Sequence, residues 1–239
     1  MTTQPSYGID APTVVRNLSV GGMVLAVAGA AMGIAGFGAQ FVPSIITAGL
    51  IMGVTALWML ASSLWIKQIV MRRMLQDHDW RGDEQVLDVG CGRGLVTIEA
   101  ARRVPRGHVR GIDMWQAQDL SDNGPDQTLA NARLAGVADR LTVDTGDARA
   151  LPYSDASFDL VTSMTVIHNI PNAEGRREAI AQIWRVVKPG GQILIFDIRH
   201  ARSYLQQLRD LGAVDTRLRG PILLWGPIGW RFAVRKPTP

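Results

Sequence analysis

Hydrophobic and polar residues divide the chain into two unlike parts. From Leu18 to Ile66 there is no Asp, Glu, Lys or Arg, whereas nearly all of the charge follows Lys67. The uncharged stretch is long enough for two bilayer crossings of about 20 residues each. Glycines and Pro43 interrupt it around residues 36–43, and proline suits the start of a helix better than its interior. The pattern predicts two membrane-spanning helices, at about 18–38 and 44–66, joined by a short turn.

Small residues recur at helical spacing in both predicted spans. Gly29 and Gly33 are four residues apart, as are Gly49 and Gly53. This spacing allows close packing of membrane helices, so these glycines are candidates for the contact between the spans or for a dimer contact. The alternative is that Gly is simply common in this chain.

Basic residues flank the predicted hairpin. Arg16 precedes the first span, Lys67, Arg72 and Arg73 follow the second, and the turn between them is uncharged. By the positive-inside rule we expect both ends on the cytoplasmic side of a bacterial plasma membrane, with the lipid bilayer as a partner. A cleaved signal peptide and a buried hairpin in a soluble fold are the alternatives. The first disagrees with the length of the apolar run, and the second with the rarity of such uncharged runs in soluble cores.

After a helix expected at 67–78, short apolar runs alternate with helical patterns. Because strands separated by helices favour a parallel arrangement, we expect a mainly parallel, seven-stranded sheet with helices on both faces. The predicted divisions are a cytoplasmic segment (1–17), the hairpin (18–66), a linker helix (67–79) and an α/β domain (80–239). Strands are predicted at 85–90, 108–114, 141–145, 158–164, 192–198, about 213–219 and about 230–236, and helices at 94–104, 126–135, 173–187 and 201–211.

Composition and charge narrow the function classes. The net charge is +4, but the basic residues are mostly scattered arginines and form no stripe, which argues against nucleic-acid binding. Cys91 is the single cysteine, so an intramolecular disulfide and a multi-cysteine zinc site are excluded. No cluster of His, Asp or Glu has the spacing of metal ligands, and we expect no metal.

A glycine-rich loop follows the first predicted strand of the α/β part. It contains Asp88, Gly90, Gly92 and Gly94. Ligands bind beyond the carboxyl ends of strands in such sheets, and glycines there allow close backbone approach. A dinucleotide loop reads G-x-G-x-x-G, whereas this one reads G-x-G-x-G after an acidic residue. Asp88 would repel a pyrophosphate but could accept a bond from an ammonium group, which favours an amino-acid-bearing nucleoside over NAD.

Five motifs in order resemble those of the class I S-adenosylmethionine-dependent methyltransferases, especially the small-molecule group called type 11. The resemblance covers roughly residues 80–236 and rests on residues 88–94, 111–114, 146–148, 158–161 and 187–191. It implies a Rossmann-like class I methyltransferase fold preceded here by a transmembrane hairpin. It also implies S-adenosylmethionine as cofactor and S-adenosylhomocysteine as product.

The resemblance also implies roles for individual residues. The loop would hold the methionine part of the cofactor, Asp113 would bond the ribose hydroxyls, and the other positions would surround the adenine or contact the cofactor through backbone. The candidate cofactor-binding residues are Asp88, Gly90, Cys91, Gly92, Gly94, Asp113, Met114, Trp115, Gly146, Asp147, Ala148, Ser163 and Met164. The segment 115–124 is longer than is common in the family. It either folds over the cofactor, with Asp119 or Asn123 adding bonds, or is a solvated loop.

His168 is the candidate catalytic residue. It follows the fourth predicted strand, in a loop that faces the transferring methyl group in the family, and its ordinary pKa suits proton transfer near neutrality. Holding the loop by a backbone bond is an equally good role for it. The apolar stretch 221–230, broken by Gly and Pro, either reaches the membrane interface or packs as an edge hairpin. We expect a membrane-anchored methyltransferase for a small lipophilic acceptor; the alternative is a catalytically silent, S-adenosylmethionine-binding membrane scaffold or sensor.

Overall fold

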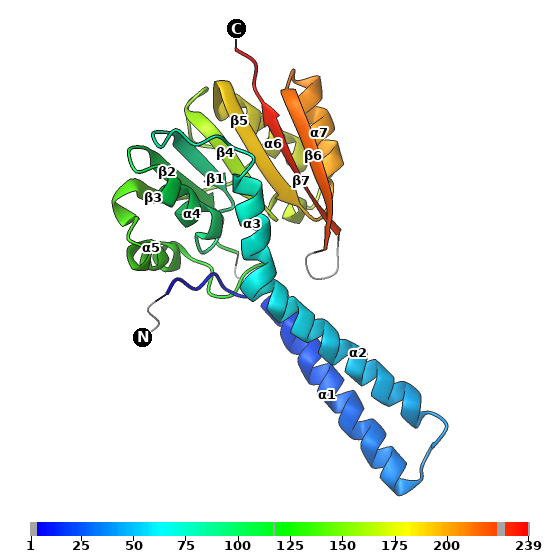
Figure 1. Ribbon diagram of the computed structural model, residues 1–239. Helices are drawn as coiled ribbons and strands as arrows, with labels where there is room; N and C mark the ends of the chain where they lie inside the picture. The colour runs from blue at the N-terminus through cyan, green and yellow to red at the C-terminus, as the bar shows by residue number, and fades with distance from the viewer. Residues whose placement is uncertain (1–3, 117, 224–227, 239) are drawn as a thin grey trace.

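The computed structural model describes residues 4–116, 118–223 and 228–238. A two-helix hairpin projects from an α/β domain (Figure 1). The hairpin consists of α1 (Pro12–Ala35) and α2 (Val42–Ala61). From α2 the chain continues through a π-helical turn, η1 (Ser62–Ile66), directly into α3 (Lys67–Leu75).

Both hairpin helices begin with a proline in the first turn, and α1 ends at Gly36, whose φ of 67° is easily adopted by glycine. By length and composition, two helices can cross a membrane, Pro12–Ala35 and the continuous helix Val42–Leu75. In their most apolar windows only 11% and 17% of the residues are buried within the protein. A core helix of a soluble fold would be mostly buried, whereas most side chains in these two windows are not covered by protein among the described residues.

The two helices make their closest approach at Gly22 and Gly49. A Cβ added to Gly22 would lie 2.8 Å from the Gly49 carbonyl oxygen, and one on Gly49 would lie 2.7 Å from the Gly22 carbonyl oxygen. Gly29 faces Ile46 at a similar distance, whereas Gly53 has open space around it. The predicted glycine contact therefore holds for Gly29 and Gly49. Gly53 takes part through its backbone, because its N lies 3.1 Å from the position of a Cβ on Gly22, while its own Cβ position faces open space.

The α3 helix belongs to the core of the α/β domain. Val70, Met71, Met74 and Leu75 are buried in one hydrophobic cluster, and the helix packs on α4 and β5. The segment predicted as a linker thus joins the hairpin to the sheet through close packing.

The sheet has seven strands in the order β3-β2-β1-β4-β5-β7-β6. The first five are parallel, and β7 runs antiparallel between β5 and β6. The predicted seven-stranded, mainly parallel sheet is confirmed. The strands are β1 (Gln85–Val89), β2 (His108–Asp113), β3 (Leu141–Thr145), β4 (Phe158–Met164), β5 (Val187–Asp197), β6 (Val214–Leu223) and β7 (Ile228–Arg235).

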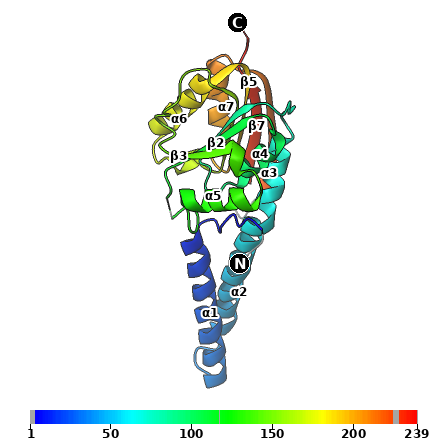
Figure 2. The same ribbon diagram turned by 90° about the vertical axis from the view of Figure 1, so that its left-hand side faces the viewer.

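Helices cover both faces of the sheet (Figures 1 and 2). On one face α3 packs with α4 (Leu95–Arg103) and α5 (Pro125–Leu134) around the first cluster. On the other, α6 (Ala173–Val186) and α7 (Ala201–Asp210) cover a second cluster. Two short 3-10 turns, η2 (Ala138–Arg140) and η3 (Ile167–Asn169), complete the described elements. The carboxyl ends of the parallel strands point towards the hairpin, which places any site there at the root of α1 and α2 (Figure 1).

Candidate active site

A pocket of about 710 Å³ lies beyond the carboxyl ends of β1, β2, β4 and β5. This is the edge where the strand order reverses between β1 and β4, and where open α/β sheets bind ligands. Its volume falls within the range of small-molecule and cofactor sites. We call the strand-end residues 88–92, 112–114 and 164–170 the floor of the pocket, and residues 4–11, 116 and 118–123 its roof.

The glycine loop of the floor packs closely against the segment that follows β4, which contains Val166. Gly90 has φ of 77°, and a Cβ there would lie 2.1 Å from Val166. Its N–H donates to the Ile112 carbonyl oxygen at 2.7 Å. Only glycine fits this position, since a side chain would be both strained and overlapped. The loop therefore presents bare backbone to the pocket.

Asp88 is fully buried at the end of β1. Its two oxygens accept hydrogen bonds from the hydroxyls of Thr97 at 2.6 Å and Thr162 at 2.9 Å. Burial raises the pKa of Asp88 to about 6, although the two hydroxyl bonds lower it. The carboxylate is thus held in place and ionised at neutral pH, as binding of an ammonium group would require.

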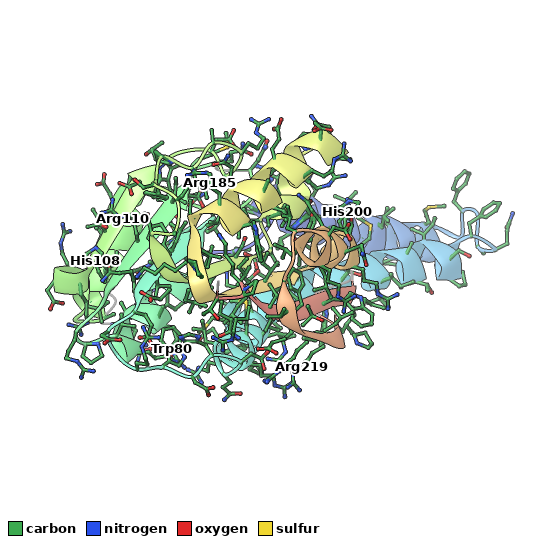
Figure 3. The ribbon with its side chains drawn as sticks, turned by 90° about the horizontal axis from the view of Figure 1, so that it is seen from above. Trp80, His108, Arg110, Arg185, His200 and Arg219 are labelled. Atoms are coloured by element: carbon green, nitrogen blue, oxygen red, sulfur yellow. The ribbon has the colours of Figure 1, made fainter. Side chains whose placement is uncertain are left out.

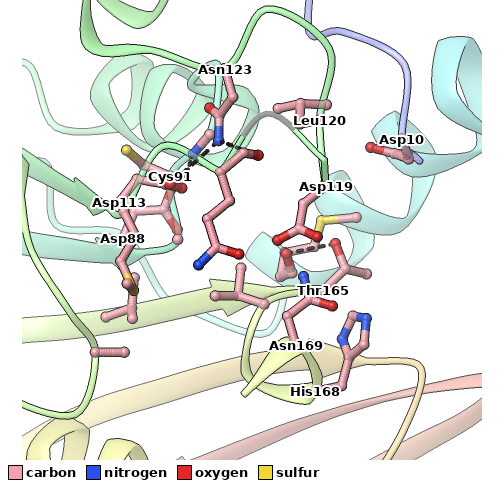
Figure 4. Close-up of a pocket in the computed structure, with 18 of the residues that line it drawn as sticks. Asp10, Asp88, Cys91, Asp113, Asp119, Leu120, Asn123, Thr165, His168 and Asn169 are labelled. Atoms are coloured by element: carbon pink, nitrogen blue, oxygen red, sulfur yellow. Dashed lines mark hydrogen bonds between the residues drawn. The ribbon is translucent and has the colours of Figure 1, made fainter. Parts of the chain in front are cut away.

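Asp113 ends β2 at the same side of the pocket. It accepts bonds from the backbone N–H of Gly92 at 2.8 Å and of Trp115 at 2.7 Å, and from the Asn123 side chain at 3.4 Å. These contacts join the glycine loop, the second strand and the roof at one carboxylate. Figure 4 shows Asp88, Cys91 and Asp113 grouped on this side.

Most of the sequence-predicted cofactor residues line this pocket. These are Asp88, Gly90, Cys91, Gly92, Asp113, Met114, Gly146, Asp147, Ala148 and Met164. Asp147 is engaged by Arg149, whose bonds lower the pKa of that carboxyl. Burial raises the pKa of the Cys91 thiol, so Cys91 is a neutral wall residue and not a thiolate.

Three predicted residues do not reach the pocket lining. Gly94 caps the start of α4, where a Cβ would lie 3.0 Å from Ile98 and from Thr128. The Trp115 indole N–H donates to Thr145 on the edge strand β3. Ser163 is buried within β4, and its hydroxyl has no partner among the described residues.

The roof is assembled from two segments that are distant in sequence. Asp10 and Leu120 form an antiparallel bridge, Ser121 exchanges two bonds with Ile9, and Ser6 exchanges two with Asn131. Covering the cofactor was one of two predicted roles for the segment 115–124, and part of it lines the pocket, namely Gln116, Gln118, Asp119, Leu120 and Asn123. Ala117 lies outside the described residues.

Lys67 ties the roof to the root of the hairpin. Its ammonium donates to the carbonyl oxygens of Tyr7 and Gly8 at 2.9 Å each and to Asp10 Oδ1 at 3.2 Å. Asp10 also accepts a bond from Ser63, in the π-helical turn. All three ammonium protons of Lys67 are therefore used in holding residues 7–10 over the pocket.

A polar cluster faces the glycine loop from the opposite wall. His168 Nδ1 lies 2.6 Å from Asp197 Oδ1, a close contact whose alignment is not that of a hydrogen bond. Asp197 is held by the backbone N–H groups of His168 and Ile198. Asp119 of the roof lies near His168 and Asn169 (Figure 4), and its burial raises the pKa of that carboxyl. The sequence-predicted His168 thus has a carboxylate partner and faces the same pocket as the glycine loop.

Several residues that line the pocket or hold its lining in place were not predicted from the sequence. Asp197 ends a buried strand as Asp88 and Asp113 do, and that position was a usable signal. No local pattern pairs the hydroxyls of Thr97 and Thr162 with Asp88. The contribution of Tyr7, Asp10 and Lys67 had no local signal, because Lys67 lies 60 residues from Tyr7 and 57 from Asp10.

The residues present fit S-adenosylmethionine. The glycine loop leaves a space that a Cβ would fill, and the buried carboxylate of Asp88 lies beneath it, which suits the amino-acid part of the cofactor. The carboxylate of Asp113 at the end of β2 suits its ribose. The Asn123 amide oxygen is buried without a partner among the described residues, beside Asp113.

The comparisons with known proteins agree with this geometry. Residues 86–191 match a family model described as a methyltransferase domain. A demethylmenaquinone methyltransferase from Lactobacillus johnsonii is 36% identical over 135 residues, which are 56% of this chain and 49% of that protein. The ubiquinone/menaquinone biosynthesis C-methyltransferase UbiE from Ruegeria sp. is 31% identical over 73% of this chain and 70% of its own length. The chain belongs to the S-adenosylmethionine-dependent methyltransferase family.

Two solved structures show the same fold at low sequence identity. The [4+2]-cyclase SpnF has a TM-score of 0.58 at 21% identity, covering 72% of this chain and 81% of SpnF. A SAM-dependent methyltransferase from Aquifex aeolicus has a TM-score of 0.53 at 17% identity, covering 69% of this chain and 88% of that one. The chain spans about half the length of several of its curated relatives, with 43% and 49% covered in two of them.

Proposed function

We propose that this protein is held at the cytoplasmic face of a bacterial plasma membrane by its α1–α2 hairpin and methylates a small, lipophilic acceptor with S-adenosylmethionine. The acceptor carries an acidic hydroxyl group, as a phenol or enol does. Methylation then occurs at that oxygen or at a conjugated carbon.

The observation that carries the proposal is the position of the pocket at the root of the hairpin. Ala11, the residue before α1, and Lys67, the first residue of α3, both line the pocket that contains the glycine loop. An acceptor that resides in the bilayer would therefore meet the site where the two apolar helices enter the domain. The basic residues at both ends of the hairpin support a cytoplasmic domain.

The names of the relatives support an apolar acceptor. One is named a demethylmenaquinone methyltransferase and the other a ubiquinone/menaquinone biosynthesis C-methyltransferase. Transfer of their substrate class to this chain is part of the proposal, since the curated relatives extend well beyond the matched region.

His168 would act as the general base. The Asp197 carboxylate beside Nδ1 favours the tautomer with the proton on that nitrogen, which leaves Nε2 free to accept a proton. When bound, S-adenosylmethionine supplies an electrophilic methyl group on a positively charged sulfur. Nε2 of His168 would take the hydroxyl proton of the acceptor, which leaves an electron pair on the oxygen or on a conjugated carbon to accept the methyl group. The methyl–sulfur bond would break with its electron pair on sulfur, so that S-adenosylhomocysteine is the leaving group. Asp197 stabilises the resulting imidazolium, while the floor aligns the two reactants.

The acceptor class can be tested with membranes that contain the protein. Methyl-labelled S-adenosylmethionine is added, and the organic and aqueous extracts are analysed separately by mass spectrometry. We expect label in an apolar product. Label only in aqueous products would overturn the lipophilic acceptor. Cofactor binding by calorimetry without any labelled product would instead favour the silent scaffold or sensor.

The base can be tested by His168→Ala, with His108→Ala on the exposed end of β2 as a control. We expect kcat to fall about 100- to 1000-fold in His168→Ala, because a positioned base contributes that much, while the Kd for S-adenosylmethionine is unchanged. Asp197→Asn should lower kcat less and alter the pH profile of kcat. Equal activity of His168→Ala and His108→Ala would exclude a base role.

The anchor has its own test. Alkaline carbonate should leave the protein in the membrane pellet, and detergent should release it. Release by carbonate alone would show that the hairpin does not span the bilayer.

A further inference from the structure

The hairpin-side end of the β6–β7 ribbon exposes apolar side chains. Leu223 is 55% exposed and pairs with Ile228, which is 52% exposed, while Ile222 beside them is half-buried. We call these three residues the apolar end of the ribbon. The other end of β6 is different in character, because it begins with Val214, Asp215 and Thr216 and is solvated.

The apolar end lies level with the junction between hairpin and domain. The Arg231 guanidinium donates to the Arg73 carbonyl oxygen and lies 3.2 Å from Asp77, so β7 is fixed beside the end of α3. From Arg231 to Ile228 the strand covers about 10 Å, at about 3.3 Å per residue. From Arg73 to Lys67 the helix covers about 9 Å, at about 1.5 Å per residue. Both run towards the hairpin (Figure 1), so Ile228 and Leu223 are level with Lys67.

Arginines form a band on the domain side of this end. Arg72 and Arg73 are exposed on α3, and Arg217 and Arg219 are exposed on β6. Arg219 points outwards at the edge of the domain (Figure 3) and shares Asp77 with Arg231. An element that binds at the surface of an anionic bilayer typically has apolar side chains towards the membrane and basic side chains directly behind them.

We propose that Ile222, Leu223 and Ile228 insert into the interfacial region of an anionic phospholipid bilayer, as a contact separate from the α1–α2 hairpin. This inference rests on the proposed anchoring. A helical hairpin by itself leaves the whole protein free to tilt in the bilayer. A second contact, displaced sideways on the sheet edge, limits that tilt and keeps the roof of the pocket turned to the membrane surface.

The test places an environment-sensitive NBD fluorophore at single engineered cysteines in the full chain, reconstituted in phosphatidylcholine–phosphatidylglycerol vesicles with or without doxyl-labelled lipid. Cys91 is buried, and the labelling of the unsubstituted chain measures its contribution. Leu223→Cys and Ile228→Cys probe the apolar end. Val214→Cys, 42% exposed at the far end of the same strand, is the aqueous control, and Leu50→Cys, 60% exposed in α2, is the insertion control.

We expect blue-shifted emission and quenching by doxyl lipid at positions 223, 228 and 50, and neither at 214. If 223 and 228 behave like 214 while 50 is quenched, the lipid contact is wrong and the hairpin stands. If 223 is quenched but 50 is not, the hairpin is wrong and the lipid contact stands. If 223 and 228 are blue-shifted without doxyl quenching, and the shift grows with the protein-to-lipid ratio, the surface binds a second copy and the lipid contact is overturned.

Discussion

The floor and the roof of the pocket are built in opposite ways. The floor consists of strand ends and tight turns whose partners are neighbouring strands, as in the bond from Gly90 to the Ile112 carbonyl. The roof consists of two segments without regular structure, which are joined to each other and held by side chains that include Lys67, Ser63 and Asn131. One half of the cofactor site is therefore part of the sheet, whereas the other half has no regular structure and is tied to the hairpin, so we expect the first to be the more rigid. Four substitutions test this difference between the floor and the roof.

The largest effect is expected at the floor, in Gly90→Ala. The added Cβ would overlap Val166 and also impose a left-handed backbone on alanine, so we expect the Kd for S-adenosylmethionine to rise more than about 100-fold. Gly136→Ala is the matched control, since its φ is 69° but its Cβ would meet nothing within 4 Å. Calorimetry should show normal binding for the control. Comparable loss in both variants would mean that backbone strain alone explains the effect.

Asp88→Asn should weaken cofactor binding at pH 7 by about 10- to 100-fold, the value of a bond to a charged group. In the wild type, affinity should fall below about pH 6, where Asp88 takes up a proton, and the variant should lack that dependence. A pH-independent affinity in the wild type would contradict the role of the ionised carboxylate.

The same carboxyl affects stability with a definite sign. Its folded pKa of about 6 is above the ordinary 3.8, so the folded state binds this proton more tightly than the unfolded state. Its contribution to the free energy of unfolding is therefore complete below about pH 4 and is lost as pH rises to about 6, by roughly 3 kcal/mol at most. Denaturant titrations of wild type and Asp88→Asn across this range measure the difference.

Lys67→Met tests the roof. Loss of the three bonds should release residues 7–10 and raise the Kd for the cofactor about tenfold, with faster hydrogen exchange in both roof segments. Lys236→Met is the matched control, because Lys236 also donates to two carbonyl oxygens but away from the pocket. It should leave the Kd unchanged. If exchange in the roof is the same in both variants, Lys67 does not hold it.

Asn123→Ala should have the smallest effect. It removes a long neutral–ionic contact of 3.4 Å between the roof and Asp113, and we expect the Kd to rise about threefold, near 0.6 kcal/mol. A change as large as that of Gly90→Ala would mean that the roof is as rigid as the floor.

Much of the fold could be predicted from local pattern. The run Ile193–Phe196 and similar stretches predict strands because they lack alternation and are short, and the structure has β5 there. The crossing of the hairpin was harder to predict, because every helical glycine offers the same spacing and only the packed geometry selects Gly22 and Gly49.

The candidate site could likewise be predicted only in part. Its floor has motifs of neighbouring residues, so Asp88 and Asp113 could be identified from the sequence. The roof depends on pairs such as Ser6 with Asn131, which no local pattern reports. Of the apolar stretch 221–230, the structure shows an edge ribbon at both ends, and residues 224–227 lie outside the described residues.

The roof also constrains the order in which the molecule can assemble. Ser6 and Asn131 are 125 residues apart, and Ile9 and Ser121 are 112 apart, so the segment that is synthesised first closes among the last. Both hairpin helices leave the ribosome before β2 and α5 exist. Only one residue, Ala11, separates Asp10 of the roof from Pro12 at the start of α1, so the placement of that helix is already set when the roof closes. Any tilt of α1 would be transmitted directly to the pocket. Under the proposed membrane anchoring, the thickness of the bilayer is therefore a variable that can act on the cofactor site.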